Sequence, residues 1–479
     1  IGRGGYAALI GGQVRNDGIV RVPTGRVGFA SGERVTLDFS GDQFLQVAIP
    51  TGADADGALI DNAGVVSASQ IEMRAATARQ AVRQAVNLSG VAEATSVSVQ
   101  GGAIVLGGGN GGTVQVSGRA DASSQQGRGG AVTITGQDIS LVGAAINVSG
   151  GAGGGQVRVG GDFRGGLAYV RADRLSADAE TAILADAIMF GNGGDVVLWS
   201  DDTTTFAGNI SAHGGANGGD GGFVEVSGAQ TLNFSGLVDT RAPAGAWGSL
   251  LLDPTNIFIS GDGGSAADLE DNLELGNVTL DTSAAVGSDA GNIIFDSDVD
   301  LIWAAQTTLT LQADNNVEFF GSVSPENGGL TIDAGSLVNV IDGASITVDQ
   351  LRVTTPLFVV NGSVVETGGG GSVNVGKFSL GSEDALWQQV SADLSPFAAT
   401  NFQAGCECHT FLRTTGGDGS VGNPHQIVDI FGLQSIGSSA LQTDSFILAD
   451  DIEAAGTSGW NFFGAVGFRP IGTFDGNLD

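Results

Sequence analysis

Residues 193–198 read Gly-Gly-Asp-Val-Val-Leu, and residues 221–226 read Gly-Gly-Phe-Val-Glu-Val. In both stretches two glycines precede a short run with apolar residues at every second position, the pattern of a β-strand with one buried face. The same cassette begins at Gly111, Gly129 and Gly154, and the intervals between cassettes differ, so some coils would carry insertions. A recurring cassette of this kind predicts a repeat protein in which each turn of the chain pairs with the next.

We therefore predict an all-β protein folded as a right-handed parallel β-helix. Small apolar side chains would fill a narrow interior, and glycines at the corners would permit positive φ and close approach of neighbouring turns. At roughly 20–25 residues per coil and about 4.8 Å per step, the rod would be about 90–115 Å long. The alternative is a β-sandwich or barrel, which needs hairpins. Dipeptides that could form them are Asp17-Gly18, Asp56-Gly57, Asp262-Gly263 and Asp342-Gly343.

One segment departs from the β pattern. Residues 75–87 contain no Gly or Pro and are rich in Ala, Gln and Arg, a composition that favours a helix. We predict a short helix near residues 75–87 that packs as an excursion against one face of the β-helix. The later run at residues 261–265, Gly-Asp-Gly-Gly-Ser, predicts a turn.

Shifts in composition predict five regions along the chain. They are β-helix coils with the helical insertion (1–95), a Gly-Gly-rich β-helix (96–250), an Asp- and Thr-rich β-helix (251–384), an irregular joint (385–413) and a final region (414–479), which the family resemblance given below implies to be the start of a Gly-Leu-rich β-helical repeat region.

The composition narrows the classes of function. The chain has 81 glycines, 9 prolines and a net charge of −33, from 52 acidic and 19 basic residues. A chain this acidic is repelled by nucleic acid, so we expect no nucleic-acid partner. No apolar run approaches the length needed to span a bilayer. Because the sequence begins and ends inside repeats, we expect it to be an interior piece of a longer protein.

Few residues qualify for catalysis. A polysaccharide-active β-helix enzyme needs paired carboxylates beside Arg or Lys. The nearest set is Asp195, Asp201, Asp202, Arg158 and Arg171. Such sets arise by chance in so acidic a chain, and no Ser-His-Asp order stands out. We therefore predict no catalytic residue and no enzyme.

Candidate metal motifs also have simpler explanations. Residues 191–195 and 217–220 are similar to calcium-binding β-roll turns, but those sites need tandem copies, so we predict Gly-rich corners. Cys406-Glu407-Cys408-His409 lacks a fourth metal ligand and predicts a local disulfide or a pair of thiols. We interpret His213 and His425 as turn residues. We therefore predict no metal site and no cofactor.

Several segments carry a family resemblance. Ala7-Ala8-Leu9-Ile10-Gly11-Gly12-Gln13-Val14-Arg15-Asn16-Asp17-Gly18-Ile19-Val20 and its continuation at 22–32 resemble the filamentous-haemagglutinin-type exoproteins of two-partner secretion. Residues 86–90 and the Leu-Leu-Leu-Asp-Pro-Thr junction within 247–255 are similar to other features of these proteins, and residues 411–476 resemble the opening of their Gly-Leu-rich repeats. The Asn-Pro-Gly type turn of the family's secretion domain is missing before Gly11.

The resemblance implies a secreted, extracellular protein of the bacterial cell surface. Its function would be that of a rigid stalk for adhesion to cells or surfaces. Its expected partners are a receptor or glycan on a host or neighbouring cell and, during secretion, an outer-membrane transporter of the two-partner type. Two other functions remain open: a self-associating extracellular scaffold or matrix filament, and a polysaccharide-active β-helix enzyme.

Overall fold

The computed structural model describes residues 2–38, 44–49, 57–77, 83–95, 101–283, 291–404, 409–462, 465–469, 471 and 475–479. These residues form two compact units. Unit 1 comprises the described residues of Ile1–Pro254 together with Leu275–Asn277. Unit 2 comprises those of Thr255–Glu274, Val278–Ser283 and Gly287–Asp479. Both units consist mostly of β-strands in long parallel sheets, which confirms the predicted all-β class.

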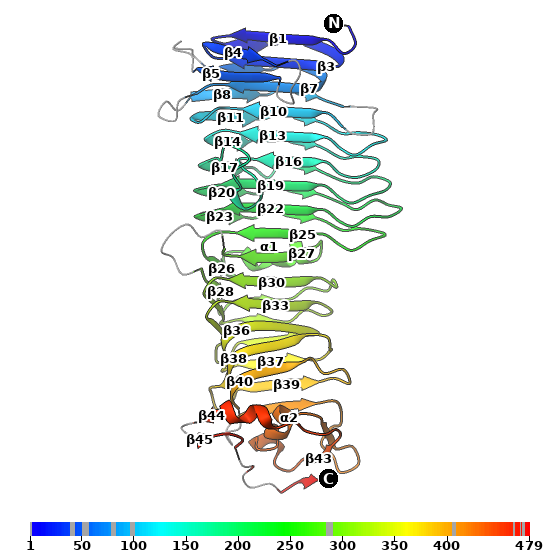
Figure 1. Ribbon diagram of the computed structural model, residues 1–479, viewed down its shortest axis with the longest axis vertical. Coiled ribbons are helices and arrows are strands. Elements are labelled where there is room, and N and C mark those ends of the chain that lie inside the picture. The colour runs from blue at the N-terminus through cyan, green and yellow to red at the C-terminus, as the bar shows by residue number, and fades with distance from the viewer. Residues whose placement is uncertain are drawn as a thin grey trace. The chain divides into compact units, whose positions relative to one another are not determined.

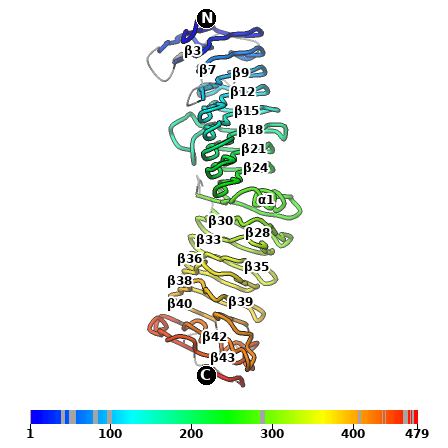
Figure 2. Tube along the Cα trace, turned by 90° about the vertical axis from the view of Figure 1, so that its right-hand side faces the viewer, coloured from blue at the N-terminus to red at the C-terminus, as the bar shows by residue number. Residues whose placement is uncertain are grey.

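Unit 1 has three columns of parallel strands (Figures 1 and 2). Column A contains β1 (Tyr6–Gly11), the second halves of β3 (Ile19–Ser31) and β7 (Val65–Ala75), β10 (Ala103–Gly107), β13 (Ala131–Thr135), β16 (Gln156–Val159), β19 (Asp195–Ser200), β22 (Phe223–Gly228) and β25 (Ser249–Asp253). Column B contains β2 (Val14–Asn16), β6 (Ile60–Asn62), β8 (Arg83–Leu88), β11 (Gly112–Val116), β14 (Asp138–Leu141), β17 (Arg174–Ala177), β20 (Thr203–Phe206) and β23 (Thr231–Phe234). Column C contains the first halves of β3 and β7, then β9 (Val91–Glu93), β12 (Arg119–Asp121), β15 (Ala145–Asn147), β18 (Ala182–Leu184), β21 (Asn209–Ser211) and β24 (Leu237–Asp239).

One strand from each column makes a layer, and buried side chains continue from layer to layer. Val132, Val157, Val196, Val224 and Leu250 occupy equivalent positions in neighbouring strands of column A, and all five are buried. Successive members of this series are separated by similar intervals along the chain, 25, 28 and 26 residues, except that Val157 and Val196 are 39 residues apart. This exceptional interval contains an extra segment, which is described below.

A glycine directly precedes each of the column A strands β19, β22 and β25: Gly194, Gly222 and Gly248. Close packing between layers requires glycine at these positions. A Cβ atom on Gly222 would lie 2.2 Å from the carbonyl oxygen of Gly194, and one on Gly248 would lie 2.0 Å from that of Gly222. The expected close approach is therefore present. The expected positive φ is not found at Gly194, Gly222 or Gly248.

The prediction of a helix near residues 75–87 is wrong, because the described residues of that segment contain strand and no helix. Strand β7 ends at Ala75 and strand β8 begins at Arg83, while residues 78–82 lie outside the described residues. Val86 is fully buried and pairs with Ile60 on one side and Val114 on the other. Pairing within the sheet thus overrides the weak helix propensity of this segment.

A hairpin covers the outward side of β7 in unit 1. Strands β4 (Arg34–Leu37) and β5 (Leu45–Ile49) are antiparallel, and Phe44 packs with Leu45 and Ala30. The buried Glu72 carboxylate accepts hydrogen bonds from the backbone N–H of Phe44 at 2.6 Å and of Leu45 at 3.1 Å. The other unit 1 pairings given above are parallel, which contradicts the hairpin-built sandwich or barrel.

Unit 2 repeats the three-column arrangement with shorter layers. Column D contains β27 (Asn277–Asp281), β30 (Thr308–Ala313), β33 (Gly329–Ala334) and the first halves of β36 (Gln350–Val360), β38 (Ser372–Leu380) and β40 (Phe397–Gln403). Column E contains β26 (Ile257–Ile259), β28 (Ile293–Phe295), β31 (Asn316–Phe319), β34 (Leu337–Val340) and the second halves of β36, β38 and β40. Column F contains β29 (Asp300–Leu301), β32 (Ser322–Val323), β35 (Ser345–Val348), β37 (Ser363–Glu366), β39 (Leu386–Val390) and β41 (Thr410–Thr414). Leu309, Leu330 and Leu351 pair in succession along column D and are equally spaced in the sequence.

Aromatic side chains fill the core of unit 2. Phe378 lies within 5.8 Å, measured between ring centroids, of the rings of Phe358, Trp387, Phe397, Phe402 and Phe411. Edge-to-face pairs predominate among these contacts, which is the geometry that aromatic quadrupoles favour.

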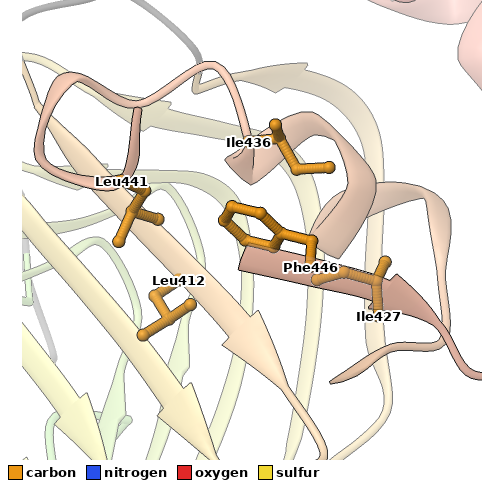
Figure 3. Close-up of a cluster of buried hydrophobic side chains, with 5 residues drawn as sticks. All are labelled: Leu412, Ile427, Ile436, Leu441 and Phe446. Atoms are coloured by element: carbon orange, nitrogen blue, oxygen red, sulfur yellow. The ribbon is translucent and has the colours of Figure 1, made fainter. Parts of the chain in front are cut away.

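Helices are few, and the sequence did not predict them. Helix α1 (Ser265–Leu273) directly follows the predicted turn and buries Ala266, Leu269 and Leu273. The C-terminal part of unit 2 contains α2 (Ile430–Ser435), the 3₁₀ helices η2 (Ser439–Leu441) and η3 (Ala455–Gly459), the parallel strands β42 (His425–Ile427), β43 (Ser445–Leu448) and β46 (Asn477–Leu478), and the antiparallel pair β44 (Asn461–Phe462) and β45 (Ala465–Val466). In Figure 3 five apolar side chains converge beneath α2: Leu412, Ile427, Ile436, Leu441 and Phe446.

Candidate functional site

A long excursion from the strand columns of unit 1 follows β16. Between β16 and β17 the chain leaves the layer over residues 160–172, here called the excursion, and includes the 3₁₀ turn η1 (Phe163–Gly165). It is the turquoise loop beside the strand stack in Figure 2. Its length accounts for the wide interval between Val157 and Val196. The excursion covers part of the outward face of column A.

The excursion lies flat on an indole ring. Because Val196 and Leu198 point inward, strand alternation turns Val197 and Trp199 outward, yet both are buried. A Cβ atom on Gly161 would lie 2.8 Å from the Trp199 ring, and one on Gly165 would lie 2.5 Å from it. Glycine at these two positions therefore allows the backbone to pack directly on the indole.

A buried glutamate holds the tip of the excursion. Both carboxylate oxygens of Glu225 accept from the backbone N–H of Arg164, at 3.1 and 3.2 Å, and one also accepts from the Ser227 hydroxyl at 3.0 Å. Arg164 has a φ of +50°, a left-handed conformation that is uncommon for a residue with a side chain. Burial, assisted by the charge of Asp253, raises the pKa of Glu225 to about 7, against the opposing effect of its hydrogen bonds to Ser227 and Arg164.

Ion pairs hold the ends of the excursion. Arg158 is almost completely buried and contacts Asp195 at 2.7 Å and Asp162 at 2.9 Å. Arg171 contacts Asp201 at 3.2 Å. Four of the five residues that the sequence nominated for catalysis therefore form two cation–carboxylate pairs, Arg158 with Asp195 and Arg171 with Asp201.

The fifth nominated residue, Asp202, is the chain neighbour of Asp201 and lies between β19 and β20. Its backbone N–H donates to the carbonyl of Asp173 at 3.0 Å. A glycosidase needs one carboxyl group to donate a proton and another to attack or to activate water. Asp195 and Asp201 instead each contact a guanidinium group, that of Arg158 or of Arg171. This arrangement fits a structural role better than proton transfer.

An open groove of about 670 Å³ lies beside the excursion. Its lining includes glycines of three successive layers: Gly193, Gly194, Gly221, Gly222 and Gly248. Three aromatic residues, Phe163, Phe223 and Trp247, join this lining together with the polar residues Asn192, Asp195, Ser249 and Asn277. We call this site the aromatic groove.

The aromatic side chains of the groove are partly exposed but held in place. Phe163 is 48% exposed and Trp247 is 36% exposed. The rings of Phe163 and Phe223 meet edge to face, with centroids 5.7 Å apart. Since the next residue after Phe163 is bound to Glu225, the position of Phe163 is fixed by the backbone as well as by its ring contact.

A second groove, of about 550 Å³, shares Trp247 with the first. There His213 contacts Asp239 at 2.8 Å through Nε2 and Asp186 at 3.6 Å through Nδ1. Ser211 lies 3.4 Å from His213 Nδ1 but only 2.5 Å from a carboxylate oxygen of Asp186, to which it donates. The hydroxyl proton is thus directed to the carboxylate, so this Ser–His–Asp group lacks the activated serine of a nucleophilic triad.

The Asn- and Asp-containing turns connect layers. The Asn192 side-chain oxygen accepts from the Asp220 N–H at 3.0 Å, and Asp220 accepts from the Ala246 N–H at 2.9 Å. These contacts are those of the predicted Gly-rich corners. Among the described residues, no group of three or more His, Cys, Asp or Glu side chains could hold a metal ion.

The remaining histidines and the cysteines have separate outcomes. Residues 405–408, which include both cysteines, lie outside the described residues. Burial, with a smaller effect of Arg469, lowers the pKa of His409 to about 4. His425 is not a turn residue as predicted: it begins strand β42, is buried, and contacts Asp444 at 3.2 Å.

Unit 2 contains a buried network of polar side chains that connects secondary-structure elements. Asp429 caps helix α2 by accepting from the Gly432 N–H at 2.8 Å, and it pairs with Arg413 at 2.7 Å. Arg413 donates to Gln389 at 2.5 Å, and Gln389 in turn donates to the buried Glu366. This network of polar side chains thus links the cap of α2 to strands of column F.

Comparisons with known proteins give little beyond this geometry. No protein-family model matches the chain. A segment of 79 residues is 38% identical to part of Halomucin from Haloquadratum walsbyi (strain DSM 16790 / HBSQ001). It covers 15% of this chain and 1% of the length of Halomucin. A match this short does not establish a family.

The described residues contain no helix that is both long and apolar enough to cross a bilayer.

Proposed function

We propose that both units fold as right-handed parallel β-helices and that the chain belongs to a secreted bacterial exoprotein of the filamentous-haemagglutinin type. A solenoid is supported by the regular recurrence of paired positions, outside the excursion in unit 1 and throughout the series Leu309, Leu330 and Leu351 in unit 2. A crystal structure of the purified chain tests this part: right-handed coils of parallel strands are expected in each unit, and left-handed or hairpin-connected strands would contradict it.

Within that architecture, the proposed function is adhesion to cells or surfaces. The aromatic groove carries the proposal, since exposed aromatic side chains held in fixed positions are typical of recognition surfaces. Adhesion is favoured over polysaccharide cleavage because Asp195 and Asp201 are engaged by guanidinium groups and Glu225 is buried beneath the excursion.

The test is retention under flow of beads that carry the chain. Beads with the wild-type chain should remain on cultured epithelial cells or on a bacterial lawn, and soluble chain should compete with them. The double variant Phe163→Ala/Trp247→Ala should lose most of this retention. Phe258→Ala is the matched control, because Phe258 is an exposed aromatic residue (67%) of unit 2, outside the groove. Retention no greater than that of beads coated with an unrelated acidic protein would refute adhesion.

Self-association is a second candidate, favoured by one surface feature. Ile188, Met189 and Phe190 follow one another in sequence and are each at least half exposed. Contiguous apolar surface of this kind is typical of protein contacts. Sedimentation velocity over a concentration series should then show assembly that Met189→Asp/Phe190→Asp abolishes. A single sedimenting species at every concentration would contradict this candidate.

A further inference from the structure

The floor of the aromatic groove is bare backbone. Five of its lining residues are glycines, so no side chain rises from these positions between the aromatic walls. The floor spans three layers, which corresponds to about 10 Å at the spacing of neighbouring strands. A ligand can therefore lie along the groove and contact more than one layer, as a chain molecule would.

The polar groups of the floor are already used by the protein. The Gly194 carbonyl accepts from the Phe223 N–H at 3.0 Å, and the Gly222 carbonyl accepts from the Ser249 N–H at 3.1 Å. Affinity must then come mainly from the aromatic faces and the polar side chains at the edge. That combination suits a ligand with apolar C–H faces and hydroxyl groups at its rim, which is the chemistry of a pyranose ring.

The charge of the groove selects among sugars. None of the residues that line it is Lys, Arg or His, although the Arg164 guanidinium lies over the Phe163 ring, 5.4 Å from the ring centroid. The net charge of the chain, −33, disfavours anionic sugars. The one lining carboxylate, Asp195, shares the Arg158 guanidinium with Asp162, so its charge is only partly compensated. Its side chain remains 47% exposed, and a carboxylate has enough lone pairs to accept from a sugar hydroxyl as well.

We infer that the aromatic groove binds a neutral oligosaccharide, whose rings stack on Phe163, Phe223 and Trp247. The inference rests on the proposed adhesive function, for which it names the class of ligand. Phe163 is positioned before the ligand arrives, through the bond between Arg164 and Glu225, so little ordering is needed on binding. The amide of Asn192 and the carboxylate of Asp195 lie in the same lining and are available to the hydroxyl groups.

The experiment is saturation-transfer NMR with the full chain and a panel of neutral hexasaccharides built from glucose, mannose, galactose or xylose, with a sulfated hexasaccharide, a uronic-acid hexasaccharide and choline as charged comparison ligands. We expect transfer to the ring C–H protons of at least one hexasaccharide. Trp247→Ala and Phe163→Ala should each weaken binding at least tenfold, whereas Trp247→Phe should restore part of it by keeping an aromatic face. Phe258→Ala should bind as the wild type does. Since Phe163 and Trp247 are partly exposed, circular dichroism should show the fold retained in both variants.

Several results would overturn the inference. They are the absence of transfer to every neutral hexasaccharide, unchanged binding by the two alanine variants, and preferential binding of a sulfated or uronic-acid oligosaccharide or of choline. The bead assay distinguishes a failure of the sugar-binding inference from a failure of the proposed adhesive function. Beads retained by a wild-type chain that binds no neutral sugar would leave adhesion standing, and sugar binding without retention would refute adhesion alone.

Discussion

Raising the pH through neutrality should destabilise unit 1 through Glu225. The pKa of this carboxyl is about 7 in the folded chain, against an ordinary value of 4.5. Below pH 4.5 both the folded and the unfolded chain hold the proton, and no stability is lost. Between pH 4.5 and 7 the unfolded chain releases the proton first, so the free energy of unfolding falls as the pH rises. Above pH 7 the loss is complete, at about 3 kcal/mol.

The variant Glu225→Gln isolates this effect. Its neutral amide keeps an acceptor for the Arg164 N–H but cannot ionise, so its stability should not change with pH on this account. The difference in stability between variant and wild type should grow by about 2–3 kcal/mol from pH 5 to pH 8, in favour of the variant. Other titrating groups cancel in this comparison because both proteins contain them.

The assay is pulse proteolysis in urea at both pH values, with the protected fragments of unit 1 identified by mass spectrometry. Resolution by fragment is needed because two units need not unfold in one transition. Glu180→Gln, in which an exposed glutamate of unit 1 is changed, serves as the control and should show no growth of the difference. The reasoning fails if Glu225→Gln and the wild type differ by the same free energy at pH 5 and pH 8.

Three further substitutions, two of them with a matched control, test the close packing of the layers, the aromatic core of unit 2 and the ion pairs of the excursion. Gly222→Ala places a Cβ atom 2.2 Å from a carbonyl oxygen of the preceding layer and should cost about 3 kcal/mol or more, measured by urea denaturation, whereas Gly422→Ala, with no atom within 4 Å, should cost little. Phe378→Ala removes the central ring of the unit 2 core and should cost about 3–5 kcal/mol, while the exposed Phe258→Ala should be close to neutral in the same assay; equal costs would contradict the aromatic core. Arg158→Met leaves two carboxylates without their cation and should speed amide hydrogen exchange across the excursion, and unchanged exchange there would show that the ion pairs do not hold it.

Strand columns could be predicted from the sequence because the signal is local. Within each cassette, buried apolar positions alternate with outward positions, which predicts a strand. The repetition of the cassette implies that equivalent positions pair, as Val196 and Val224 do. The segment that contains Val86 misled the prediction because its composition favours a helix. Its partners Ile60 and Val114, which decide its conformation, belong to the neighbouring layers and lie far from it along the chain.

Helix α1 did leave a sequence signal. Ala266, Leu269 and Leu273 recur at the spacing of successive helical turns and form its buried side. That periodicity is typical of a short amphipathic helix, and the adjacent glycines drew attention to a turn instead.

The aromatic groove could not be predicted from local patterns. Phe163 and Trp247 are distant in the sequence and share the groove because the layers of β19 and β22 stack between their own. The long interval between cassettes was a usable sign of an excursion, and Trp199 at an outward strand position was a sign that something covers it. Neither sign reveals that Glu225, two strands away from β16, receives the tip of the excursion.

The excursion also shows how this scaffold can be altered. It begins and ends without disturbing the register of β16 with β19, since Val157 still pairs with Val196 across the extra residues. A corner of the layer is therefore a place where a segment can be exchanged for another while the strands keep their partners. Two side chains set the conditions that a grafted segment must meet. The segment needs glycine where its backbone packs on the Trp199 indole, and it needs a backbone N–H that can donate to the Glu225 carboxylate. A replacement that meets these two conditions would give the same stack of layers a different specificity.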